Sequence, residues 1–212
     1  MKKLLTENQI ETVKLHLQKK KKRIDIYVDL INSNTIDDSY KDKYKNYYTM
    51  KRSFKLNNEN YYNVYFEYLK NLKSNSSSID FGTILKYLSQ KTTASFISPS
   101  YASKLLATIN PNKPVWDTNV LIQLNNGLYE EYKKAQTDYY KARDEIKYIN
   151  KLITIYNNLE KNLNDEYLNT NKGKEFIDIF DSVFENIPEF IAISPMKKID
   201  IILWSLGNKP KL

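Results

Sequence analysis

The chain contains no cysteine in its 212 residues, and this absence excludes disulfides, thiolate zinc sites and cysteine nucleophiles. Histidine is almost as scarce. The single one, His16, lies near Lys14 and Lys19–Lys22, on what the spacing predicts to be the polar face of a helix. A Ser-His-Asp triad and a histidine-rich metal site are therefore not expected. The sequence predicts no metal ion and no cofactor.

Long apolar runs are absent as well. No stretch approaches the roughly 20 consecutive apolar residues of a transmembrane helix, and the first residues, MKKLLT, lack the apolar run of a signal peptide. We therefore expect a cytoplasmic protein that makes no membrane contact. A chain of 212 residues is long enough to bury a substantial core, so residues 1–212 are expected to form one domain.

Apolar residues recur at helical spacing along the chain, and the alternation typical of strands persists nowhere. The sequence therefore predicts an all-α bundle, in which the polar stretch 71–79 is a loop or linker. Each expected helix start pairs a capping side chain with a following apolar stripe. The expected capping residues are Thr6, Asp80, Ser98, Asp117 and Ser194.

The longest regular pattern covers residues 128–156, where apolar side chains recur at alternating steps of four and three. A period of about 3.5 residues, with no Pro or Gly before Gly173, predicts one long helix that lies along another helix. We expect this stripe to pack inside the bundle against the amino-terminal helix. The alternative is that the stripe forms the seam of an oligomer.

Positive charge is concentrated at the amino terminus. The formal net charge is +8, and residues 1–24 contain eight lysines and arginines against Glu7 and Glu11. The helix that starts at Thr6 is expected to continue through Lys19–Arg23 to Ile31. Its basic run is either a solvated face or a set of phosphate contacts to nucleic acid. Tyrosines between residues 40 and 68 are predicted to be mostly helix core, with a nucleic-acid surface as the alternative.

The segment 95–120 contains the candidate functional residues of the chain. Ser98-Pro99 starts a helix whose apolar stripe leaves Lys104 on the opposite side. The neighbours expected on that side are Ser100, Ser103 and Ala107, which are small enough to let a large ligand approach.

Asn110-Pro111 should end this helix, and Asp117 should cap the next one. Lys104 and Asp117 are thirteen positions apart on consecutive helices. We expect both side chains to face one cleft.

Two motifs in this segment resemble the helix-hairpin-helix DNA glycosylases. Pro99-Ser-Tyr-Ala-Ser-Lys104 is similar to that superfamily's Pro-Gly-x-Gly-x-Lys hairpin, and Pro114-Val-Trp-Asp117-Thr-Asn-Val120 is similar to its Val-Asp-Thr-x-Val segment. The resemblance implies a helix-hairpin-helix-like centre, with Lys104 as the nucleophile and Asp117 as the catalytic carboxylate. Ser100 and Ala102 replace the hairpin glycines, the interval from Lys104 to Asp117 is shorter than usual, and no cysteine is present for an iron–sulfur cluster.

This resemblance implies an enzyme that excises a damaged or modified base from DNA, with lyase activity through a Schiff base on Lys104. Modified foreign DNA is one candidate target. Flipping a base out of a duplex requires a side chain that stacks or fills the gap. The residues expected to contact DNA are Ser98, Ser100, Tyr101, Ser103, Trp116, Lys19, Lys20, Lys22 and Arg23.

A second hypothesis requires no chemistry. The chain would be a basic helical module that binds nucleic acid or another protein without catalysis. Asp117 would then only cap a helix, Lys104 would be an ordinary solvated lysine, and Trp116 and Tyr101 would pack in the core or at its rim.

Overall fold

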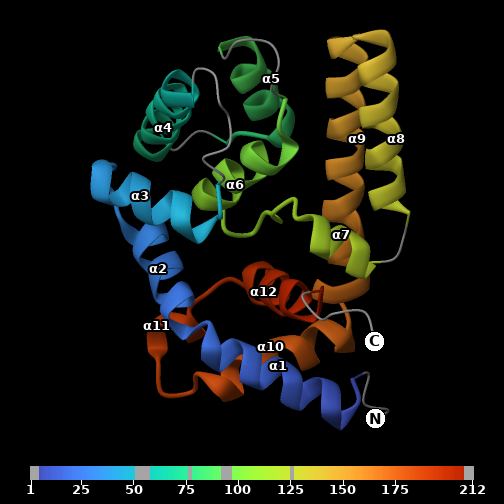
Figure 1. Ribbon diagram of the computed structural model, residues 1–212. Coiled ribbons are helices and arrows are strands. Elements are labelled where there is room, and N and C mark those ends of the chain that lie inside the picture. The colour runs from blue at the N-terminus through green and yellow to red at the C-terminus, as the bar shows by residue number, and fades with distance from the viewer. Residues whose placement is uncertain (1–4, 51–57, 76–77, 92–96, 125–126, 208–212) are drawn as a thin grey trace.

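The computed structural model describes residues 5–50, 58–75, 78–91, 97–124 and 127–207 (Figure 1). These ranges contain twelve α-helices, one π-helical turn and no strand, which confirms the predicted all-α class. The elements are α1 (Glu7–Lys19), α2 (Lys21–Asn32), α3 (Asp38–Tyr47), α4 (Asn58–Ser74), α5 (Phe81–Lys91), α6 (Pro99–Ile109), α7 (Thr118–Leu124), α8 (Leu128–Ala142), α9 (Glu145–Leu163), η1 (Asn164–Leu168), α10 (Asn171–Val183), α11 (Pro188–Ile191) and α12 (Pro195–Gly207).

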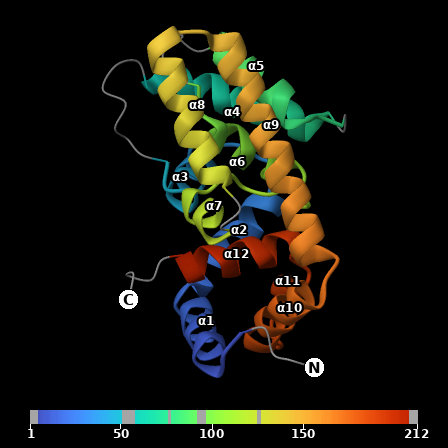
Figure 2. The same ribbon diagram turned by 90° about the vertical axis from the view of Figure 1, so that its right-hand side faces the viewer.

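Eight of the helices form two groups that meet at the centre of the molecule (Figures 1 and 2). One group consists of α1, α10, α11 and α12, and the other of α3, α4, α5 and α6. The short α7 packs against α12 between them. The consecutive helices α5 and α6 pack against each other, as a hairpin of helices would; residues 92–96 of their connection lie outside the described ranges.

Side-chain caps begin the helices where the sequence predicts them. Thr6 forms a reciprocal capping box with Gln9, and Ser98 Oγ accepts from the Tyr101 amide at 3.3 Å. Equivalent side-chain to amide hydrogen bonds are made by Asp80, Asp117 and Ser194. A capping side chain accepts a hydrogen bond from an amide that has no partner within the helix. Because only a few residue types can do this, the sequence predicts the caps.

The stripe at residues 128–156 does not form one helix, so that prediction is wrong. The chain reverses at Arg143, whose φ of 56° is left-handed, and Asp144 caps α9. The helices α8 and α9 lie side by side as an antiparallel hairpin (Figures 1 and 2). The stripe therefore packs against its own second half and against α5, not against the amino-terminal helix. Ile146, next to the turn, is 75% exposed because the stripe is interrupted there.

The amino-terminal helix also breaks, at Lys20, where a continuous helix to Ile31 was expected from the spacing. Arg23 fixes the direction of α2 after the break: its guanidinium donates to the Tyr47 carbonyl and, at 2.9 Å, to Thr49 Oγ1. The basic run is therefore the joint between two helices. These long-range hydrogen bonds leave no periodic signal in the sequence.

The central helix α6 is buried on almost every side. Ser103, Lys104 and Ala107 are all buried, so the small residues beside Lys104 admit neighbouring protein segments and not an external ligand. The prediction that Ser103 and Ala107 lie on a side of this helix open to a ligand is therefore wrong. The predicted loop at 71–79 is also shorter than expected, because α4 continues to Ser74.

Tyrosines fill much of the core beside α6, as predicted for the 40–68 region. Tyr40, Tyr44, Tyr47, Tyr48 and Tyr65 are all buried. The hydroxyls of Tyr44 and Tyr65 are hydrogen-bonded at 2.8 Å, which removes the penalty of burying them. This packing brings the turn after α3 close to α6.

Gly173 in the first turn of α10 is required by a close backbone approach. A Cβ on this residue would lie 2.0 Å from the Tyr167 carbonyl oxygen, so η1 and α10 would have to separate. We expect Gly173→Ala to lower the free energy of unfolding by about 1–3 kcal/mol, measured by urea unfolding. The exposed neighbour provides a control, because Lys174→Ala should change stability by less than about 0.5 kcal/mol. Equal stability of the two variants would contradict this account.

Candidate functional site

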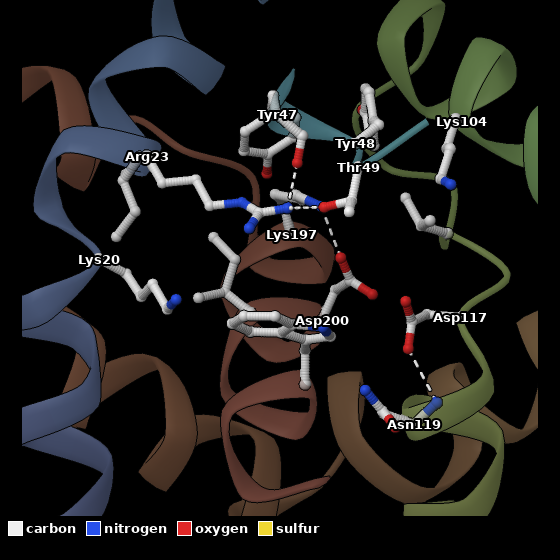
Figure 3. Close-up of a pocket in the computed structure, with 14 residues that line it drawn as sticks. Lys20, Arg23, Tyr47, Tyr48, Thr49, Lys104, Asp117, Asn119, Lys197 and Asp200 are labelled. Carbon is white, nitrogen blue, oxygen red and sulfur yellow. Dashed lines mark hydrogen bonds and ion pairs between the residues drawn. The ribbon is translucent and has the colours of Figure 1, made fainter. Parts of the chain in front are cut away.

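A cavity of about 370 Å³ lies where the two groups of helices meet, and we call it the central cavity (Figure 3). It is bordered by the α1–α2 joint, the turn after α3, α6, the connector before α7, and α12. Its charged lining residues come from all of these elements except the turn. They are Lys20, Arg23, Lys104, Asp117, Lys197 and Asp200.

The structure brings Lys104 and Asp117 to the same cavity, on its side opposite Lys20 and Arg23 (Figure 3). Two hydrogen bonds fix the connector that carries Asp117. The Trp116 amide donates to Ser103 Oγ at 2.8 Å, and the Tyr156 hydroxyl donates to the Pro114 carbonyl at 2.9 Å. Because Ser103 precedes Lys104 and Trp116 precedes Asp117, the first bond ties the two functional positions together directly.

Lys104 is a buried amine without a polar partner among the described residues. It is 9% exposed, and its Nζ lies 5.2 Å from the ring centroid of Tyr101 and 5.9 Å from that of Tyr48. Burial lowers the pKa of Lys104 from 10.5 to about 8, an effect that Asp117 opposes and the cations Lys197 and Arg23 reinforce. About a tenth of this amine is therefore neutral at pH 7, and the neutral form is the one that attacks as a nucleophile.

Asp117 combines a structural contact with a position in the cavity. Its Oδ1 accepts a hydrogen bond from the Asn119 amide at 2.8 Å, so it caps α7 as predicted. The side chain is only half-buried, and Figure 3 shows its carboxylate at the cavity, below the Lys104 amine. A carboxylate held in this way can stabilise positive charge that develops on a bound ligand.

A buried ion pair on α12 occupies the middle of the cavity wall. Lys197 Nζ lies 2.5 Å from Asp200 Oδ2, and both residues are almost fully buried. Burial alone would lower the pKa of Lys197, but the Asp200 carboxylate beside it raises that pKa well above the usual range. Lys197 therefore stays charged. The two residues are three positions apart on one helix, which is a spacing at which oppositely charged side chains pair.

The basic run of the amino-terminal region divides into residues that face the cavity and residues that do not. Lys20 and Arg23 line it, and their charged groups lie 5.1 and 5.3 Å from the ring centroid of Trp204. Trp204 is half-buried: it packs against the core and also lines the cavity. Lys19 lines an adjoining cavity, whereas Lys22 is exposed.

Three of the predicted DNA contacts have buried side chains, and their contact with DNA stays a prediction. Trp116 is 2% exposed, stacked near Phe81 and edge-on to Tyr132, so its ring packs within the protein. Ser103 is fully buried and holds the connector. Tyr101 is buried among core tyrosines, and its ring contributes to the surroundings of Lys104.

Ser98 and Ser100 are half-buried at the start of α6, where Ser98 caps the helix. Their contact with DNA stays a prediction. None of the helices in the described ranges is both long and apolar enough to span a bilayer. In the same ranges, no three His, Asp or Glu side chains gather into a group that could hold a metal ion.

The comparisons with known proteins add no relative. No protein-family model matches the chain, and neither the curated proteins nor the solved structures include a significant match.

Proposed function

We propose that this chain is a DNA glycosylase-like enzyme of the helix-hairpin-helix type, which releases a damaged or modified base. The observation that carries the proposal is the meeting of two groups at one cavity with a cationic opposite side: a buried amine that has no hydrogen-bond or ion-pair partner within the described ranges, and a capping carboxylate. A buried lysine without a partner is destabilising, and groups with perturbed pKa values in a cavity are typical of functional sites. The two motifs that resemble the superfamily contain these same two residues.

The proposed chemistry gives each side chain a separate role. Cleavage of an N-glycosidic bond builds positive charge on the sugar, and the Asp117 carboxylate would stabilise that charge. The neutral Lys104 amine would attack the sugar C1′ while the base leaves with the bonding electron pair and takes up a proton. Opening of the sugar ring then gives an imine on Lys104, from which the strand can be cleaved by elimination.

The size of the central cavity suits one nucleotide. A volume of about 370 Å³ lies at the lower end of the range of roughly 300–1,000 Å³ for small-ligand sites. A duplex segment would not enter such a space, so the substrate base would have to be flipped out or supplied by a single strand.

The test uses DNA oligonucleotides that carry different base modifications, with borohydride present to trap a Schiff base. Asp117→Asn is the informative variant because asparagine also caps helices and should keep α7 intact. Asp144→Asn is its matched control: Asp144 caps α9 through the Lys147 amide at 2.9 Å and does not line the central cavity.

We expect wild type and Asp144→Asn to release the base and Asp117→Asn to be slower by about 10²–10³-fold. Lys104→Met should abolish the trapped covalent complex. The rate of trapping should rise about tenfold per pH unit below pH 8 and level off above it, because only the neutral amine reacts.

A non-catalytic binding module is the second candidate, and it is favoured by the hydrogen bond with which Asp117 caps α7. On that hypothesis no modified oligonucleotide loses its base. Oligonucleotides that stay intact with every protein, together with no trapped complex, would refute the enzyme and leave the binding module.

A further inference from the structure

The central cavity has a neighbour without any carboxylate. A second cavity of about 420 Å³, which we call the basic cavity, is lined by His16, Lys19, Lys20, Arg23, Trp204 and Ser205. Lys20, Arg23 and Trp204 also line the central cavity, so these three side chains form a wall that the two cavities share. The Lys104 and Asp117 end of the central cavity lies away from the wall (Figure 3).

The positive charge of the basic cavity is not neutralised within the described protein. None of Lys19, Lys20 and Arg23 forms an ion pair with a carboxylate in the described ranges, although several surface lysines do, such as Lys41 with Asp38. An anion is the ligand that this charge distribution fits.

The wall is also rigid and aromatic. Arg23 is held by the Tyr47 carbonyl and by Thr49 Oγ1, so its guanidinium is fixed before a ligand arrives. Lys20 and Arg23 both lie within about 5 Å of the Trp204 ring centroid. A fixed cation beside an aromatic ring matches a nucleotide, which presents a phosphate and a planar base together.

We propose that the basic cavity binds the backbone phosphate next to the nucleotide that occupies the central cavity, with the strand passing over Trp204. This inference rests on the proposed function, because it takes nucleic acid as the substrate. It separates Lys19 and Lys20, which line the basic cavity and would contact a phosphate, from Lys21 and Lys22, which line neither cavity.

The test measures binding of a fluorescent single-stranded oligonucleotide to the Asp117→Asn protein, so that no base is released during titration. Lys19→Ala/Lys20→Ala is compared with Lys21→Ala/Lys22→Ala, which removes the same charge from the same run. A circular dichroism melt checks that both variants fold. A neutral methylphosphonate is then placed at each position near the modified base in turn.

We expect the first double variant to bind about tenfold or more weakly, and its slope of log affinity against log salt to fall by about 0.7, the value for one phosphate of a single strand. The second should bind within about threefold of the parent. One methylphosphonate position should weaken binding to the parent and have no further effect on the first double variant.

Equal losses in the two double variants, or losses spread over all methylphosphonate positions, would overturn the subsite and leave only diffuse attraction. Base release by wild type under those results would leave the glycosylase proposal standing. Localised phosphate binding without base release would refute the enzyme while supporting the subsite. Absence of binding to any oligonucleotide would refute both.

Discussion

Replacing Asp200 with alanine should lower the free energy of unfolding by about 3–5 kcal/mol. The substitution leaves the Lys197 ammonium, which is 6% exposed, without the carboxylate that lies 2.5 Å away. The rings of Tyr27 and Tyr47, with centroids 5.2 and 5.7 Å from Nζ, would offset only a small part of this loss. Urea unfolding at pH 7 measures the effect.

The exposed pair of Lys41 and Asp38 is a matched control, since it has the same spacing of three on α3. Asp38→Ala should cost less than about 1 kcal/mol, because solvent screens exposed pairs. Removing both charges with Lys197→Met and Asp200→Leu should restore most of the stability lost in Asp200→Ala. A cost for Asp200→Ala no greater than that for Asp38→Ala would show that the pair is not buried in solution.

Unlike Asp200→Ala, Lys104→Met should raise the free energy of unfolding, by about 1–3 kcal/mol at pH 7. Lowering the pKa of Lys104 from 10.5 to about 8 corresponds to roughly 3 kcal/mol of destabilisation, because the unfolded chain holds this proton more tightly than the folded one. Contacts of the amine with Tyr48 and Tyr101 offset part of it. A substitution that stabilises the fold while it removes activity is the behaviour of a residue retained for function.

The pH dependence gives this prediction a second readout. Below pH 8 the folded and unfolded chains both hold the proton, so the full penalty is present. Between about pH 8 and 10.5 only the unfolded chain holds it, so wild-type stability rises with pH relative to Lys104→Met and the difference between the two proteins narrows.

Lys198→Met is the control for Lys104→Met, because Lys198 is equally buried but donates to the Ile191 carbonyl at 2.8 Å and lies 2.6 Å from Asp181. That variant should lose stability. If Lys104→Met loses stability as well, Lys104 is a structural residue.

Local signals account for what the sequence predicts well. Caps such as Thr6, Ser98 and Asp117 act on amides two or three residues away, so their role is contained in a short window. The sequence also predicts that Lys104 and Asp117 meet at one cavity, because the short connector between their helices leaves little freedom in how the helices can be placed.

Tertiary packing decides what the sequence does not reveal. In the sequence, apolar residues keep their heptad spacing across the reversal at Arg143, because both arms of the hairpin bury such side chains, although Ile146 beside the turn is exposed. Small residues around Lys104 have the composition of a ligand-facing surface but contact other parts of the chain. Lys20, at the break between α1 and α2, lies against the Trp204 ring of α12. This contact joins segments that are far apart in the sequence.

The hydrogen bond from the Trp116 amide to Ser103 Oγ also limits how this protein can vary. It closes the chain from Ser103 to Trp116 into a ring, and Lys104 and Asp117 are the residues that follow these two ends. Deleting a residue from the connector would break this hydrogen bond or displace one group relative to the other. Functional relatives should therefore preserve the interval from Lys104 to Asp117 even where the identities of the intervening residues drift.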